Sequence, residues 1–146
     1  MKIAIGSDHA AYEVKESILQ YLSSLGHSVI DVGTHSTDSC DYPDYAAEVS
    51  QLVQTEDTDR GILICGTGIG MSIAANRFEG VRAALCYSVE LAELSRRHNN
   101  ANVLCVGART QRLEDIQAII ETWLRTEWDG GRHAGRLNKI ETLAKR

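Results

Sequence analysis

The sequence has a single proline and lacks any apolar run long enough to span a membrane. The apolar stretch within Met1–Gly6 is too short for a signal peptide, so we expect a cytoplasmic protein. An excess of positive charge is also lacking, since the net charge is −5 at pH 7. This balance argues against nucleic acid and membrane as partners. Any anion that the protein binds must therefore be held by a local cluster of arginine and histidine.

The four cysteines lack the spacing of a metal site or a redox dithiol, because no CxxC pair is present. We expect free thiols. Cys86 and Cys105 lie in apolar runs, which predicts small buried side chains. Repeats, low-complexity segments and linkers are absent as well. Residues 1–146 are therefore expected to form one domain.

Short apolar segments alternate with helical patterns along the whole chain. Strands are expected at residues 3–5, 28–32, 61–65, 81–86 and 102–106. Helices are expected at residues 10–25, 44–54, 88–97 and 113–124, and another follows the glycine turn and runs through Asn76. An amphipathic helix is expected after Gly130-Gly131. This alternation predicts an α/β fold, namely a three-layer, doubly wound, Rossmann-like domain around a five-stranded parallel sheet.

Polar and glycine residues follow the expected strands where a ligand site should lie. Ligands of open parallel sheets bind beyond the carboxyl ends of the strands. Asp8 and His9 follow the first strand, the turn 65–70 the third, and Arg109 the fifth. We expect these residues to converge at one edge of the sheet. Asp8 also stands where a helix N-cap is found, so capping is an alternative role for its carboxylate.

The turn Cys65-Gly66-Thr67-Gly68-Ile69-Gly70 joins a buried strand to a helix. Its glycines allow the backbone to approach a ligand, and its amides at a helix start favour an anion. A Gly-Lys-Ser/Thr continuation and the full dinucleotide pattern are both missing. A thiol at this position is a candidate base or nucleophile. The alternative is a tight turn beside a cysteine that packs as a hydrophobe.

Asp41 and Tyr42 precede the helix that Pro43 is expected to enter. Either these two residues line the pocket or Asp41 caps that helix.

Arg132 and Arg136 lie four residues apart on the expected C-terminal helix, a spacing that suits a phosphate. A solvated basic face is the alternative. His98 ends a helix that runs back across the sheet, so it should lie at the edge opposite Cys65. It is either a C-cap cation or part of a neighbouring subunit's site.

Several motifs, in this order, resemble the type B ribose-5-phosphate isomerases and their relatives acting on allose 6-phosphate, galactose 6-phosphate and four-carbon sugar phosphates. The motifs are Gly6-Ser7-Asp8-His9, Asp41-Tyr42-Pro43, Cys65-Gly66-Thr67-Gly68-Ile69-Gly70-Met71-Ser72, Ala75-Asn76, His98-Asn99 and Gly131-Arg132-His133. The resemblance covers nearly the whole chain. One departure is Ala11, where many members have glycine, which puts fine substrate choice in question.

The resemblance implies interconversion of ribose 5-phosphate and ribulose 5-phosphate through an enediolate, without metal or cofactor. It implies that Cys65 is the base and that His98 assists ring opening, with Thr67 or Asp8 as its partner. The implied substrate-binding residues are Asp8, His9, Tyr42, Gly66, Thr67, Gly68, Ile69, Gly70, Asn99, Arg109, Arg132 and Arg136. Among them, the arginines would hold the phosphate and the turn amides the enediolate oxygen.

The resemblance also implies a homodimer whose active site is shared between subunits, and such dimers could pair into a tetramer. The C-terminal helix would then extend to the partner subunit. A hexose 6-phosphate or four-carbon sugar phosphate isomerase on the same scaffold is one alternative. A phosphate- or nucleotide-binding regulatory domain, in which Cys65 is structural, is an alternative from another class.

Overall fold

A computed structural model describes residues 1–143 and contains five parallel strands in one sheet. The strands are β1 Lys2–Ser7, β2 Ser28–Gly33, β3 Arg60–Cys65, β4 Ala83–Leu85 and β5 Val103–Gly107. Their order across the sheet is β2-β1-β3-β5-β4, and every neighbouring pair is parallel. The expected five-stranded parallel sheet is confirmed. Strand β3 lies at its centre, between β1 and β5.

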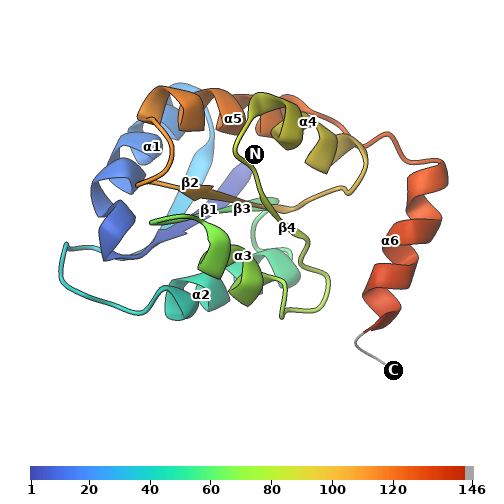
Figure 1. The fold of residues 1–146 in the computed structure, drawn as a ribbon, viewed down its shortest axis with the longest axis horizontal. Helices are drawn as coiled ribbons and strands as arrows, with labels where there is room; N and C mark the ends of the chain where they lie inside the picture. Colours follow the sequence, from blue (N-terminus) through green and yellow to red (C-terminus); the bar gives the residue numbers. More distant parts are fainter. Residues whose placement is uncertain (144–146) are drawn as a thin grey trace.

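Helices cover both faces of the sheet, so the molecule has three layers (Figure 1). The helices are α1 Tyr12–Ser24, α2 Tyr42–Gln54, α3 Ile69–Ala75, α4 Val89–Arg97, α5 Leu113–Arg125 and α6 Arg132–Leu143. Helices α1, α4 and α5 lie on one face, and α2 and α3 on the other. None of the helices within residues 1–143 is long and apolar enough to cross a membrane.

The central strand β3 shows why this sequence forms a sheet covered on both sides. All six of its residues are buried. Ile62 and Ile64 belong to the core beneath α1, α4 and α5, whereas Leu63 and Cys65 belong to the core beneath α2 and α3. Successive side chains of a strand point to opposite faces, so a continuous apolar run fills both cores. The alternation also places the Cys65 side chain on the α2–α3 side.

The fourth strand is shorter than expected from the sequence and starts at Ala83 rather than Val81. Side-chain amides form several of the hydrogen bonds at the start of this strand. The Ala83 amide donates to Asn76 Oδ1 at 2.8 Å, and Asn76 Nδ2 donates to the Ala83 carbonyl at 2.9 Å. The Arg82 amide donates to Asn102 Oδ1 at 2.7 Å. Such long-range bonds from side chains leave no periodic pattern in the sequence.

The first expected helix begins differently as well. Residues His9–Ala11 form a single 3-10 turn before α1 starts at Tyr12. The second helix starts at Tyr42, two residues earlier than expected, with Pro43 in its first turn. Proline fits there because the first amides of a helix have no internal partner.

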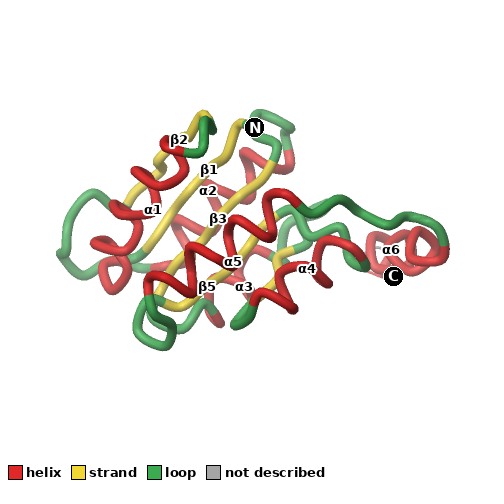
Figure 2. Tube along the Cα trace, turned by 90° about the horizontal axis from the view of Figure 1, so that it is seen from above, coloured by secondary structure: helices red, strands yellow, loops and turns green. Residues whose placement is uncertain are grey.

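Helix α6 lies at one end of the molecule, separate from the three layers (Figure 2). Gly130 and Gly131 precede it with positive φ angles of 64° and 57°, which glycine adopts readily. Leu137 is buried and Glu141 pairs with Arg82 at 2.8 Å, whereas Ile140 leaves 49% of its surface exposed. The expected amphipathic helix is therefore present. Residues 144–146 of the expected domain lie outside the described part.

Candidate active site

The carboxyl ends of β1, β3 and β5 bring three expected site segments together. The Asp8 amide donates to the Ile64 carbonyl at 3.3 Å. The Arg109 amide donates to the Gly66 carbonyl at 3.0 Å, and the Arg109 side chain passes beside Gly66. We refer to Asp8, His9, Tyr42, Cys65–Gly70 and Arg109 as the carboxyl-edge cluster.

The thiol of Cys65 is fixed at the start of the glycine turn. Its Sγ accepts a hydrogen bond from the Gly68 amide at 3.1 Å, and the residue leaves 5% of its surface exposed. Gly68 has a φ of +80°, and a Cβ atom there would lie 2.9 Å from the main chain of Val106. Both the backbone conformation and the close approach require glycine. The turn therefore exists because residue 68 has no side chain.

Two amides of the turn are already engaged within it. The Gly68 amide donates to Cys65, and the Ile69 amide donates to Thr67 Oγ1 at 3.2 Å. Because the Thr67 hydroxyl accepts that bond, its own proton remains free to point elsewhere. The amides of residues 66–70 were all expected to bind a ligand. Those of Gly68 and Ile69 have partners inside the turn, so fewer amides than expected can do so.

Two tyrosines support the turn from either side. Tyr42 lies against Gly70, where a Cβ atom would come within 2.5 Å of the tyrosine ring. The Tyr87 hydroxyl donates to the Thr67 carbonyl at 2.6 Å and lies 2.9 Å from Thr110 Oγ1. Tyr87 was not identified from the sequence. Its hydroxyl contacts Thr67, which lies 20 positions earlier in the sequence. A single tyrosine after a strand does not indicate such a contact.

Asp8 forms a local hydrogen bond, whereas His9 contacts Cys40, which lies 31 positions further along the sequence. Asp8 Oδ1 accepts from the Ala10 amide at 3.0 Å, so the capping role is confirmed, whereas the Asp41 carboxylate forms no cap bond. His9 Nδ1 accepts from the Cys40 amide at 3.2 Å. In a neutral imidazole that accepts at Nδ1, the proton is on Nε2. His9 therefore has an N–H group to offer an anion.

The other buried thiols differ from Cys65 in their surroundings. Cys86 and Cys105 lie within the two cores and leave at most 1% of their surface exposed. Burial raises the pKa of Cys86 to about 11 and raises that of Cys105 well above the ordinary value. The expectation that both are small buried side chains is confirmed.

A second group of expected site residues lies at the opposite edge. Helix α4 runs from the carboxyl end of β4 back to the amino end of β5, and His98 is its C-cap residue. The imidazole of His98 stacks on that of His133 in the first turn of α6, with ring centroids 4.6 Å apart and 16° between the planes. We refer to His98, Asn99, Arg132, His133 and Arg136 as the amino-edge cluster.

Charge in the amino-edge cluster is strongly positive. Burial lowers the pKa of His133, and the neighbouring His98, Arg132 and Arg136 lower it further. Within residues 1–143, Arg132, Arg136 and Arg109 form no ion pair. Free guanidinium groups with no carboxylate partner are suited to an anionic ligand.

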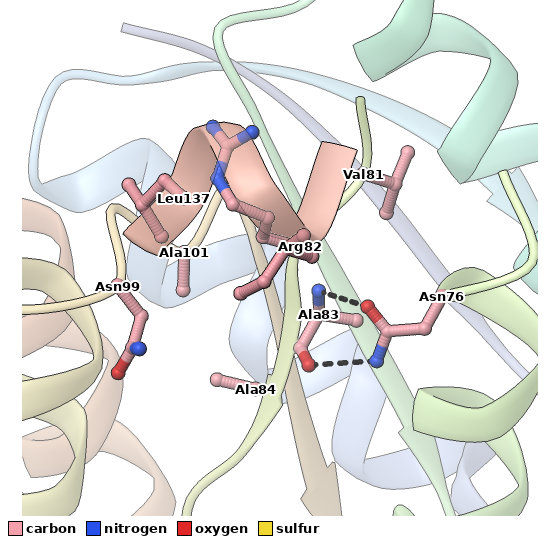
Figure 3. A pocket seen from close by; sticks show the side chains of 9 residues that line it. Asn76, Val81, Arg82, Ala83, Ala84, Asn99, Ala101 and Leu137 are labelled. Carbon is pink, nitrogen blue, oxygen red and sulfur yellow. Dashed lines mark hydrogen bonds between the residues drawn. The ribbon is translucent and has the colours of Figure 1, made fainter. Parts of the chain in front are cut away.

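Asn99 lines a cavity of about 390 Å³ between β4 and α6. Figure 3 shows the Asn99 side chain on the same side of the cavity as Leu137, with Asn76 on the opposite side and Arg82 between them. Asn76 is held in place there by its two bonds to Ala83. The cavity contains Asn99 but no residue of the carboxyl-edge cluster.

The single chain therefore holds two separate groups of expected site residues. Cys65 ends β3 at the carboxyl edge, whereas His98 precedes β5 at the amino edge. One group of possible metal ligands was found among the described residues. It consists of His98, Asp129 and His133, whose ligand atoms lie within 4.8 Å of one another.

Known proteins are similar to this chain over nearly its whole length. The profile of the family described as Ribose/Galactose Isomerase matches residues 3–140. The ribose-5-phosphate isomerase B of Escherichia coli is 46% identical over 145 residues, which cover 99% of this chain and 97% of that protein. A putative sugar phosphate isomerase of Rickettsia bellii is 50% identical over 95% of this chain and 96% of its own length.

Solved structures agree closely with the fold. Clostridium thermocellum ribose-5-phosphate isomerase B superimposes with a TM-score of 0.98 at 49% identity, covering 99% of this chain and 98% of the other. The Thermotoga maritima ribose 5-phosphate isomerase has a TM-score of 0.96 at 52% identity, covering 97% and 98%. The match spans both the carboxyl-edge and the amino-edge clusters. The chain therefore belongs to the ribose/galactose isomerase family.

Proposed function

We propose that this protein interconverts ribose 5-phosphate and ribulose 5-phosphate, with Cys65 as the base. The observation that carries the proposal is the thiol itself. It ends the central strand β3 and is held at 3.1 Å by the Gly68 amide at the edge where ligands of parallel sheets bind. Relatives named as ribose-5-phosphate isomerases B are similar over nearly the whole chain.

The proton transfer would take place at the glycine turn. The thiolate of Cys65 removes the proton from C2 of the open aldose, and the electron pair forms the C1–C2 double bond of an enediolate. The negative charge then resides on O1, and backbone amides near it stabilise that charge. Since the amides of Gly68 and Ile69 are engaged within the turn, Gly66, Thr67 and Gly70 are the candidates. Transfer of the O2 hydroxyl proton to O1, together with return of the first proton from Cys65 to C1, gives the C2 carbonyl of the ketose.

Ring opening requires a separate proton transfer. We assign it to His98, whose imidazole can take the proton of the O1 hydroxyl while the ring oxygen is protonated. Thr67 or Asp8 would assist from the carboxyl-edge cluster. Thr67 is suited to this role because its hydroxyl proton is not used inside the turn. Asp8, His9, Tyr42 and Asn99 would contact the sugar.

The phosphate would be bound by arginine side chains. Arg109, Arg132 and Arg136 have no carboxylate partner within the described residues, and His9 has an N–H group available. A guanidinium can donate two parallel bonds to one phosphate. This assignment leaves the amides of Gly66, Thr67 and Gly70 for the enediolate oxygen. The reaction as proposed requires no metal or cofactor.

The two groups of residues would meet in a homodimer. Ile69 and Ile73 lie on α3, the helix that follows the glycine turn, and leave 49% and 64% of their surfaces exposed. Apolar side chains four apart on a helix form one face, which favours burial against a partner. A twofold axis would bring the amino-edge cluster and α6 of one subunit to the carboxyl-edge cluster of the other. Such dimers could pair into a tetramer.

Isomerisation of a hexose 6-phosphate or a four-carbon sugar phosphate is the alternative on this scaffold, since the family description includes galactose. The sequence left open whether Ala11 affects this choice. Ala11 is fully buried in the core beneath α1, so it presents no exposed surface to a ligand in the single chain.

Initial rates on ribose 5-phosphate, allose 6-phosphate and galactose 6-phosphate, measured side by side, test the proposal. We expect the largest kcat/KM for ribose 5-phosphate. A larger kcat/KM for either hexose 6-phosphate would show that this hexose phosphate is the preferred substrate. Binding of all three without any turnover would instead favour the regulatory domain.

A further inference from the structure

The side chains of His98, Asp129 and His133 converge from three parts of the chain. His98 caps α4, Asp129 lies in the loop after α5, and His133 is in the first turn of α6. We propose that these three residues bind a divalent transition metal ion of the Zn²⁺ class, and that the bound ion inhibits isomerisation by occupying His98. The inhibition rests on the proposed function, whereas the binding does not.

The donor set matches this class of ion. Two imidazole nitrogens and one carboxylate oxygen are common ligands of Zn²⁺, with a fourth position left for water. Metal–ligand bonds of about 2.0–2.2 Å in a tetrahedral site place ligand atoms roughly 3.3 Å apart. The three ligand atoms lie within 4.8 Å of one another without an ion, so they need to close by about 1.5 Å or less. The imidazoles of His98 and His133, stacked with 16° between their planes, must also turn relative to each other so that both lone pairs point at one ion. Asp129 is exposed and precedes Gly130-Gly131, which allows that adjustment.

Arg97 fixes the direction of the Asp129 carboxylate. Its Nε lies 3.2 Å from both carboxylate oxygens, and its carbonyl accepts from the Asp129 amide at 3.0 Å. Each oxygen keeps a further lone pair for a metal ion. Hydrogen bonds of this kind behind a ligating carboxylate are typical of metal sites.

The two imidazoles have unused nitrogen atoms. Neither His98 nor His133 forms a side-chain hydrogen bond within residues 1–143, although His133 leaves only 8% of its surface exposed. One nitrogen of each ring is therefore available to a metal ion without the loss of a hydrogen bond inside the protein.

The surrounding charge sets the strength of binding. Arg132 and Arg136 lie near His133 and repel a cation, and Asp129 is the only carboxylate of the ligand set. We therefore expect a reversible inhibitor and not a resident ion. Occupation removes the lone pair that His98 needs for proton transfer, so turnover stops while the ion is bound.

Titration with Co²⁺, followed by its visible absorption and by calorimetry, tests the binding directly. We expect one ion per chain without a thiolate charge-transfer band. His133→Gln and Asp129→Asn should each weaken binding about tenfold or more. His27→Gln, a matched loss of one imidazole outside the group, should leave it unchanged. Equal affinity in Asp129→Asn and the parent, or a thiolate band from a cysteine, would overturn the site.

Asp129 is exposed, so we expect Asp129→Asn to fold. This variant therefore tests the metal site even if His133→Gln does not fold. In the isomerase assay, Zn²⁺ should inhibit the parent at the concentrations at which it binds. Each variant is compared with its own metal-free rate, and half-inhibition should shift by the same factor as the affinity. Unshifted inhibition in Asp129→Asn would refute the inhibitory role. Failure of the proposed isomerase activity would leave the Co²⁺ titration as an independent measurement.

Discussion

Cys65 and His98 lie at opposite edges of the same sheet. Cys65 ends β3 at the carboxyl edge, and His98 ends α4 where the chain returns to the amino edge. A proposed reaction that uses both side chains therefore requires two copies of the chain. The following predictions test this requirement and the role of each group.

Replacement of Cys65 by alanine should lower kcat by orders of magnitude, because the group that moves the proton is lost. Sugar phosphate binding should persist, since the arginines are unchanged. The measurements are steady-state rates and calorimetric binding. Cys86→Ala is the matched control, because its thiol lies in the core away from the turn. Similar losses of kcat in both variants would argue against a catalytic thiol.

Mixing Cys65→Ala with His98→Ala should restore activity after dissociation and reassembly. Each variant alone has two defective sites, whereas a mixed dimer has one intact site. Random pairing gives about half mixed dimers, so recovery of roughly a quarter of the parent rate is expected. Verified mixed dimers that remain inactive would exclude the shared site.

Arg132→Ala and Arg136→Ala should each raise KM about tenfold or more and change kcat little. Loss of a charge-assisted bond to phosphate weakens ground state and transition state alike. Arg112→Ala is the control, since that guanidinium is exposed and 3.5 Å from Asp115. An unchanged KM in both α6 variants would remove these arginines from the phosphate site.

Tyr87→Phe should lower kcat by about threefold to tenfold, which corresponds to loss of one hydrogen bond that orders the turn. The bond in question joins the Tyr87 hydroxyl to the Thr67 carbonyl at 2.6 Å. Tyr21→Phe loses a comparable bond, to Glu121 at 2.9 Å, and should leave kcat unchanged. Equal kcat in Tyr87→Phe and the parent would show that the turn needs no such support.

His133 should make folding stability depend on pH. Burial, followed by the charges of His98, Arg132 and Arg136, lowers its pKa. The stability that neutral His133 contributes is therefore complete above its pKa in the unfolded chain, about 6.5. It is lost as pH falls through the lower pKa of His133 in the folded chain. The drop in Tm from about pH 7.5 to about pH 5.5 should be smaller in His133→Gln than in the parent. An identical drop in Tm in both proteins would show that His133 is not the source of the pH dependence.

The sequence was sufficient to predict the sheet and the carboxyl-edge cluster for a physical reason. Apolar runs such as Ile62–Ile64 and the glycine at position 68 are local signals, and parallel strands align their ends without further information. Contacts that join distant segments were not predictable in this way. Tyr87 with Thr67, His98 with His133, and Asn76 with Ala83 depend on where helices end in three dimensions.

Strand β3 and helix α6 should differ in local stability, because β3 is central in the sheet and α6 lies at one end of the molecule. Amides in the middle of a buried sheet open only when the whole domain unfolds, whereas a helix at one end can detach at low cost. Mild denaturant should then separate α6, with Arg132 and Arg136, from a sheet that still holds Cys65 in place. Activity would be lost before hydrogen exchange shows any weakening of β3.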